Sequence, residues 1–182
     1  MISAVLDACV LVPSVLADTL LRCAEDEHYR PLWSAEILDE VRRNLPQSVS
    51  AAAADRRIQA MRAFFPEAEV DGYQDLVDQM TNHPKDRHVL AAAVAARADF
   101  VVTANLRDFP VHALDPHAIE AQHPDDFLCD LLDVSPSDTQ IPARHQSLTM
   151  PRLCFSRWHR CRGTPAACFG PLASAAMMIG FF

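Results

Sequence analysis

Short apolar runs alternate with helical segments along residues 1–142, and this alternation constrains the fold more than any other feature. The runs SAVLD, RPLWS, AEVDGY, DFVVTAN and AIEAQ are predicted strands. The segments between them carry apolar residues at helical spacing, as in AEILDEVRRNL, which follows Ser34 as a natural N-cap. Strands separated by helices imply a parallel sheet covered on both faces. We therefore expect an α/β fold, a three-layer sandwich with a parallel central sheet.

Polar residues stand just past the end of one predicted strand. In FVVTANLRDFP the strand FVVT runs into a loop that carries Asn105, Arg107 and Asp108. The loop is either a polar turn or part of a binding site. Open α/β sheets bind ligands in the crevice beyond the carboxyl ends of their strands, so this loop is placed where a site is expected.

Four carboxylates occupy comparable positions along the chain. Asp7 ends the first strand, Glu40 lies in the helix after the second, Asp86 opens the helix before FVVTAN, and Asp108 follows that strand. The first and fourth strands of a parallel sheet can be neighbours, and helix starts can face the same crevice. Four acids that are distant in sequence can therefore converge.

Each acid also has a structural interpretation. The helix macrodipole favours an acid at the position of Asp86, Asp108 can shape a turn, and Glu36 competes with Glu40 for any role on their helix. Asp7 is harder to explain, because it lies inside an apolar run. A buried carboxylate without a partner shifts its pKa or coordinates a cation. Clustered acids without Cys or His favour Mg²⁺ or Mn²⁺ over zinc.

Three blocks together resemble a PIN domain, close to the bacterial VapC-type toxin nucleases. They are VLDACVLVP, WSAEILDEVRRNL and KDRHVLAAAVAARADFVVTANLRDFP, and the resemblance covers about residues 2 to 135. The resemblance places Asp7, Glu40 and Asp86 on the family's three recurrent metal-site acids and Asp108 on the fourth, with Thr103 and Asn105 as supporting polar groups. Many relatives carry an acid at the position of Asn105 and an Asn at that of Cys9, which leaves the number of metal ions open.

The resemblance implies a Mg²⁺-dependent endoribonuclease that is the toxin of a type II toxin-antitoxin system. Thr103 would hydrogen-bond a carboxylate, and Asp108 and Asn105 would orient the ion or its waters. Arg107 and Lys85 would meet substrate phosphate. The implied partners are RNA, a VapB-like antitoxin whose C-terminal segment often presents an Arg to the acidic groove, and a second copy of the chain.

Other functions remain open at this stage. One alternative is a PIN fold without catalysis that serves as a binding module, which would account for Asn105 and Cys9. A phosphatase of the haloacid-dehalogenase type needs a second Asp where Cys9 stands, and a response receiver needs a late lysine, whereas Lys85 is the chain's only one. The net charge of −8 argues against nucleic-acid binding by bulk electrostatics, but not against a local metal-filled pocket.

Compartment and tail are the remaining predictions. The start MISAVLDACVLVP lacks a basic segment, and no apolar run approaches the ~20 residues that span a bilayer, so we expect a cytoplasmic protein with free thiols. Residues 143–182 form a basic, Cys-containing tail with five Arg and no Asp or Glu. It lacks hydrophobic periodicity and resembles a gene read in a shifted frame, so we expect poor order there. Its Cys and His spacing matches no usual zinc pattern.

Overall fold

The computed structural model describes residues 1–134, which belong to two units. The first unit is Met1–Pro124 and contains the sheet; the second begins at Asp125, and helix α7 (Pro124–Val134) is its described part. No helix in the described residues is long and apolar enough to cross a membrane. In the same part of the chain, Cys9 and Cys23 carry free thiols, as predicted.

The first unit is built on a parallel sheet. Its strands are β1 (Ser3–Leu6), β2 (Arg30–Ser34), β3 (Glu69–Val70), β4 (Phe100–Val102) and β5 (Glu120–Gln122). They lie in the order β3-β2-β1-β4-β5, and every pair is parallel. The predicted α/β class is confirmed, and β1 and β4 are neighbours.

Helices and 3₁₀ turns connect the strands. The helices of this unit are α1 (Ala8–Leu11), α2 (Ser14–Glu25), α3 (Ala35–Asn44), α4 (Ala51–Phe64), α5 (Arg87–Ala96) and α6 (Val111–Leu114). The 3₁₀ turns are η1 (Gln74–Gln79), η2 (Pro84–Asp86), η3 (Leu106–Asp108) and η4 (Asp115–His117). The Ser34 hydroxyl accepts a hydrogen bond from the Ile37 N–H at 3.2 Å, so the predicted N-cap of α3 is confirmed.

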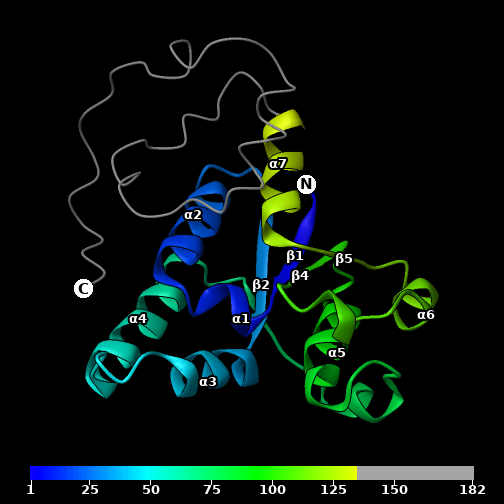
Figure 1. The fold of residues 1–182 in the computed structure, drawn as a ribbon, viewed down its shortest axis with the longest axis horizontal. Helices are drawn as coiled ribbons and strands as arrows, with labels where there is room; N and C mark the ends of the chain where they lie inside the picture. Colours follow the sequence, from blue (N-terminus) through cyan, green and yellow to red (C-terminus); the bar gives the residue numbers. More distant parts are fainter. Residues whose placement is uncertain (135–182) are drawn as a thin grey trace. The chain divides into compact units, whose positions relative to one another are not determined.

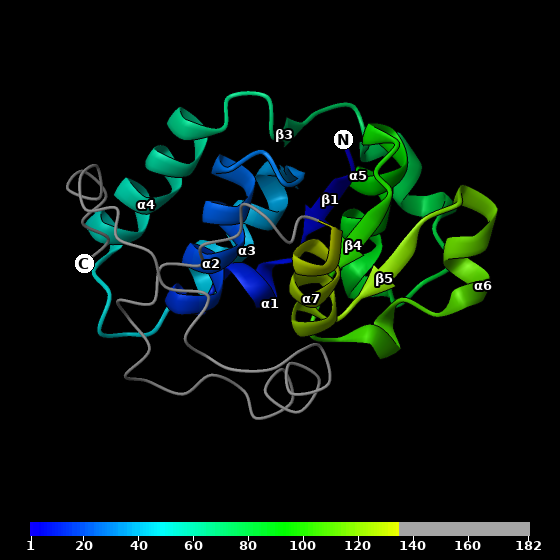
Figure 2. The same ribbon diagram turned by 90° about the horizontal axis from the view of Figure 1, so that it is seen from above.

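The strand order reverses at β1, and this reversal creates the place for a site. The chain moves from β1 to β2 and β3 on one side, then returns to β4 on the other. Connections between parallel strands are right-handed, so helices before and after the reversal cover opposite faces. Figures 1 and 2 show α1 and α2 on one side of the strands and α5 on the other. In open α/β sheets ligands bind beyond the carboxyl ends of the strands at such a reversal, which here are the ends of β1 and β4.

Helix α1 is an element that the sequence did not predict. Its single turn follows Asp7 directly, where the apolar run had no helical period. The Arg57 guanidinium on α4 donates to the carbonyl oxygens of Leu11 at 2.6 Å and Val12 at 3.4 Å. These bonds satisfy carbonyls that a helix end leaves without partners. A distant arginine therefore stabilises the turn that follows Asp7.

The predicted domain boundary at about residue 142 and the tail 143–182 lie outside the described residues, so they stay predictions. We expect a chain ending at Met150 to keep its fold and its divalent-ion binding, because a segment without periodicity buries little apolar area to offset an ordering cost of about 1–2 kcal/mol per residue. Thermal unfolding and limited proteolysis of both chains check this. A truncated protein that unfolds, beside a full chain that resists protease, would make the tail a structural element.

Candidate active site

Asp7 is a buried carboxylate with one satisfied oxygen. It follows β1 and is only 3% exposed. The Thr103 hydroxyl, just past β4, donates to Asp7 Oδ2 at 2.7 Å, and the Cys9 thiol donates to the same oxygen at 3.1 Å. In the described part of the chain, Oδ1 makes no hydrogen bond. The expected contact between Thr103 and a carboxylate is present, and one oxygen of Asp7 remains available.

The polar turn after β4 is tied to the same group. The Asn105 N–H donates to Thr103 Oγ1 at 3.0 Å, and the Ala104 N–H donates to Cys9 Sγ at 3.3 Å. Burial, followed by the charge of Asp7, raises the pKa of the Cys9 thiol to about 12. The thiol therefore stays protonated and donates to the carboxylate, instead of acting as a nucleophile.

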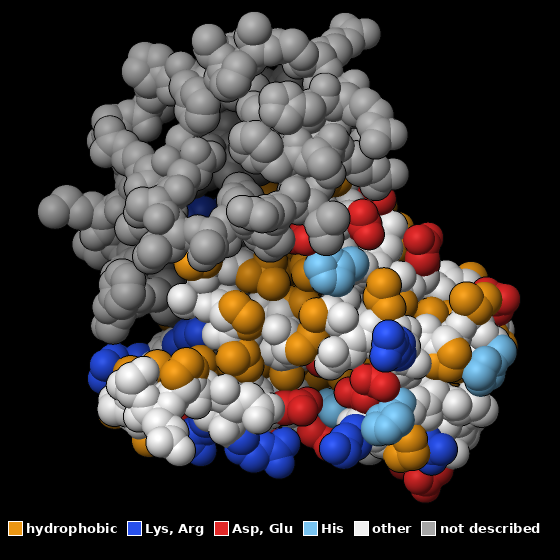
Figure 3. Space-filling model, in the orientation of Figure 1, with side chains coloured by type: hydrophobic (Ala, Val, Ile, Leu, Met, Phe, Trp, Pro, Cys, Tyr) orange, Lys and Arg blue, Asp and Glu red, His pale blue; other side chains and the backbone are white. Residues whose placement is uncertain are grey.

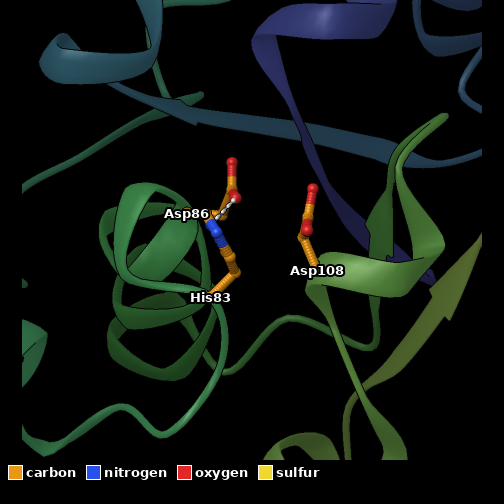
Figure 4. Close-up of side chains that lie close together, drawn as sticks. All are labelled: His83, Asp86 and Asp108. Atoms are coloured by element: carbon orange, nitrogen blue, oxygen red, sulfur yellow. Dashed lines mark hydrogen bonds and ion pairs between the residues drawn. The ribbon is translucent and has the colours of Figure 1, made fainter.

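A second group of side chains lies between η2 and η3. His83 Nδ1 is 3.2 Å from Asp86 Oδ2, and one potential ligand atom from each of His83, Asp86 and Asp108 lies within 4.8 Å of the others. Figure 4 shows the two carboxylates extending in the same direction from facing elements, with the imidazole beside Asp86. The backbone N–H of His83 also donates to the backbone carbonyl of Asp108 at 3.1 Å, and this bond joins η2 to η3.

Glu40 approaches from α3 and is half-buried. His88, which α5 buries to 8% exposure, points Nε2 toward the Glu40 carboxylate at 3.6 Å, too long for a hydrogen bond. Burial raises the pKa of Glu40; His88 opposes this shift, and the charges of Asp7 and Asp86 add to it. Glu36, one turn earlier, instead accepts a hydrogen bond from the Tyr73 hydroxyl at 3.5 Å.

The carboxylates of the candidate site interact through their like charges. Burial raises the pKa of Asp86, and the charges of Asp7 and Asp108 raise it further. Asp86 therefore interacts with all three other acids, since Glu40 is also within its influence. Crowded carboxylates with a free oxygen on Asp7 are unfavourable alone and favourable around a hard divalent cation. The residues present fit Mg²⁺ or Mn²⁺.

The remaining predicted residues lie around this cluster with exposed side chains. They are Asn105, Arg107 and Lys85. Among the described residues the Asn105 side-chain amide makes no hydrogen bond, while its backbone N–H donates to Thr103; its role in orienting an ion or its waters stays a prediction. Sequence reasoning missed His83 and His88. His83 stands three positions before Asp86 in a first helical turn, a spacing that places both side chains on one face; His88 gave no such signal.

The arrangement agrees with a family model. Residues 3–107 match the model described as "PIN domain". The chain belongs to the PIN domain family. The match includes β1 and the acid that follows it, α3, α5 and β4, and it ends within η3, so the family resemblance seen in the sequence is confirmed.

One curated relative matches part of this PIN domain chain. It is "Putative ribonuclease VapC50" of Mycobacterium tuberculosis, 49% identical over 89 residues. The match covers 49% of this chain and 48% of the relative, so the chain spans about half the length of that protein. No solved structure matches the chain.

The raised pKa values of Glu40 and Asp86 predict how the metal-free protein responds to pH. A carboxyl whose pKa is higher in the folded state binds its proton more tightly there, so ionisation lowers the free energy of unfolding. We expect stability in EDTA to fall as pH rises from about 4, the ordinary carboxyl range, through the raised folded pKa values of both groups. In urea unfolding, Glu40→Gln should flatten this fall. An equal slope in both proteins would contradict it.

Proposed function

We propose that this chain is a divalent-metal-dependent endoribonuclease and the toxin of a type II toxin-antitoxin pair. The observation that supports the proposal is that Asp86 and Asp108, from η2 and η3, offer possible ligand atoms within 4.8 Å of each other, while Asp7 follows β1, the strand beside β4. Burial raises the pKa of Glu40 on α3, and the charges of Asp7 and Asp86 raise it further. The PIN domain match and the name of the curated relative support the same activity.

The chain's own residues would hold and orient the cation. Asp7 is fixed by Thr103 and Cys9, so its free oxygen has a defined direction. Asp86 and Glu40 would offer the neighbouring carboxylates, and Asp108 a further one from η3. A bound Mg²⁺ or Mn²⁺ supplies Lewis acidity, which activates water and offsets the charge of a phosphodiester. One carboxylate would accept the proton of the attacking water.

RNA fits this site because its phosphates can meet both the cation and nearby cationic side chains. Figure 3 shows Lys and Arg side chains around neighbouring acidic and histidine side chains on one face of the molecule. Arg107 and Lys85 are exposed and lie within η3 and η2, directly before Asp108 and Asp86 in the chain. They would hold the phosphates on either side of the scissile phosphodiester bond. Because the chain has a net charge of −8, RNA binding would depend on these local contacts and not on the overall charge.

A basic antitoxin segment suits the same acidic cluster. Four carboxylates close together would produce a local negative potential, which would attract an Arg side chain of a protein partner. We propose a VapB-like antitoxin as that partner, with homodimerisation as a second assembly.

The test combines divalent binding with RNA cleavage. Purified protein should bind Mn²⁺ in calorimetry and cut a structured RNA in Mg²⁺, with activity lost in EDTA and restored by the metal. Binding without cleavage of any RNA in a total cellular pool would favour the catalytically inactive binding module. Absence of divalent binding would overturn the metal site itself.

A further inference from the structure

We propose that His83 is a nitrogen ligand of the cation at this site and biases it toward Mn²⁺ over Mg²⁺. The inference deepens the proposed metal-dependent function and rests on it. It concerns His83, to which the family resemblance gives no role and which lies beside Asp86, one of the four predicted metal-site acids.

Geometry gives the first argument. Two ligands at right angles on an octahedral ion, each at about 2.1 Å, lie about 3 Å apart. His83 Nδ1 and Asp86 Oδ2 are 3.2 Å apart, which matches that spacing. The potential ligand atoms of both residues also lie within 4.8 Å of a carboxylate oxygen of Asp108. A single ion can therefore contact all three side chains with small adjustments.

Backbone structure gives the second argument, because it holds the imidazole in place. His83 precedes Pro84 at the start of η2, and its N–H donates to the Asp108 carbonyl at 3.1 Å. The Asp86 N–H donates back to the His83 carbonyl at 2.9 Å. The three residues are thus joined through their main chains before any ion binds, and the imidazole needs little reorganisation to act as a ligand.

The ligand chemistry determines which ion benefits. Mg²⁺ takes oxygen ligands and keeps much of its water, whereas imidazole suits transition metals. A site of carboxylates alone is suited to Mg²⁺, and replacing one water by a nitrogen favours Mn²⁺. His88 is the competing imidazole, but its Nε2 is directed at Glu40 and the ring is buried to 8% exposure. The His83 side chain is 46% exposed, and its Nδ1 already lies beside the Asp86 carboxylate at 3.2 Å.

Pulsed electron paramagnetic resonance of the full chain loaded with Mn²⁺ tests this directly. The wild type should show modulation from a coordinated ¹⁴N nucleus, and His83→Gln should lose it, while His88→Gln keeps it. In calorimetry, His83→Gln should weaken Mn²⁺ binding on the order of tenfold, with little change for Mg²⁺.

Three results would overturn the proposal. Wild-type protein that binds Mn²⁺ without a nitrogen signal leaves the metal site standing and makes His83 only a hydrogen-bond partner of Asp86. A signal that is lost in His88→Gln and kept in His83→Gln would show that His88, and not His83, is the nitrogen ligand. No Mn²⁺ binding at all removes the proposed metal-dependent function together with the role of His83.

Discussion

Replacing Asp7 or Asp86 with Asn will abolish metal-dependent RNA cleavage and leave the protein folded. Both residues sit at the centre of the charge cluster, Asp7 through burial and Asp86 through its interaction with the other acids. Charge stabilisation by a metal contributes several kcal/mol, and about 1.4 kcal/mol corresponds to a factor of ten, so we expect a loss of at least about a hundredfold.

The same substitutions should slightly stabilise the metal-free protein. Asn nearly preserves the volume of Asp, and at position 7 its amide oxygen can still accept from the Thr103 hydroxyl, which now lies 2.7 Å from the carboxylate. Removing one of several like charges relieves repulsion, and we expect a gain of about 0.5 kcal/mol in EDTA. With saturating Mn²⁺ the order should reverse, because the wild type gains binding free energy that the variant lacks.

Asp26→Asn is the matched control. Asp26 ends α2 just before β2 begins, so it lies at the amino ends of the strands, away from the crevice. Its activity and Mn²⁺ affinity should equal those of the wild type. A folded Asp7→Asn protein that cuts RNA at the wild-type rate in Mg²⁺ would show that Asp7 does not belong to the metal site.

The α/β architecture could be predicted from the sequence because the strands and the longer helices had local signals. Ser34 and the apolar stripe of α3 gave a helix start and a buried face, and the apolar run before Thr103 gave a strand. The family resemblance then indicated which positions in the three sequence blocks correspond to the family's site residues. Helix α1 was missed, since its single turn is supported by Arg57 from a distant helix, a contact without any local signal.

The sequence indicated the acids of the candidate site, and their roles as metal ligands stay predictions. Carboxylates at strand ends have a pattern that topology brings together, and β1 beside β4 is what joins Asp7 to Thr103. His83 has no place in such a pattern, because its position follows from the 3₁₀ turn η2 and its bond to the Asp108 carbonyl. The hydrogen bond from the Asn105 backbone N–H to Thr103 likewise had no sequence signal, and the predicted role of the Asn105 side chain stays a prediction.

Glu40→Gln should remove most of the RNA cleavage, whereas Glu36→Gln should have a mild effect. The two acids are one turn apart on α3, and sequence separated them only through the family resemblance. The structure adds a physical difference: burial raises the pKa of Glu40 and the charges of Asp7 and Asp86 raise it further, while Glu36 accepts a hydrogen bond from Tyr73 at 3.5 Å. Gln can still accept that bond, so Glu36→Gln keeps its contact and serves as the matched control.

The effects on metal binding should follow the same division between the two glutamates. Removing one carboxylate charge from the cluster should weaken Mn²⁺ binding on the order of tenfold in Glu40→Gln, and Glu36→Gln should bind as the wild type does. Calorimetry and single-turnover cleavage measure the two quantities separately. Loss of both in Glu36→Gln, with both retained in Glu40→Gln, would place α3 one turn out of register with the site. Because Asp7 and Asp86 are positioned by other elements, their assignments would survive that result, and only the contribution of α3 would move.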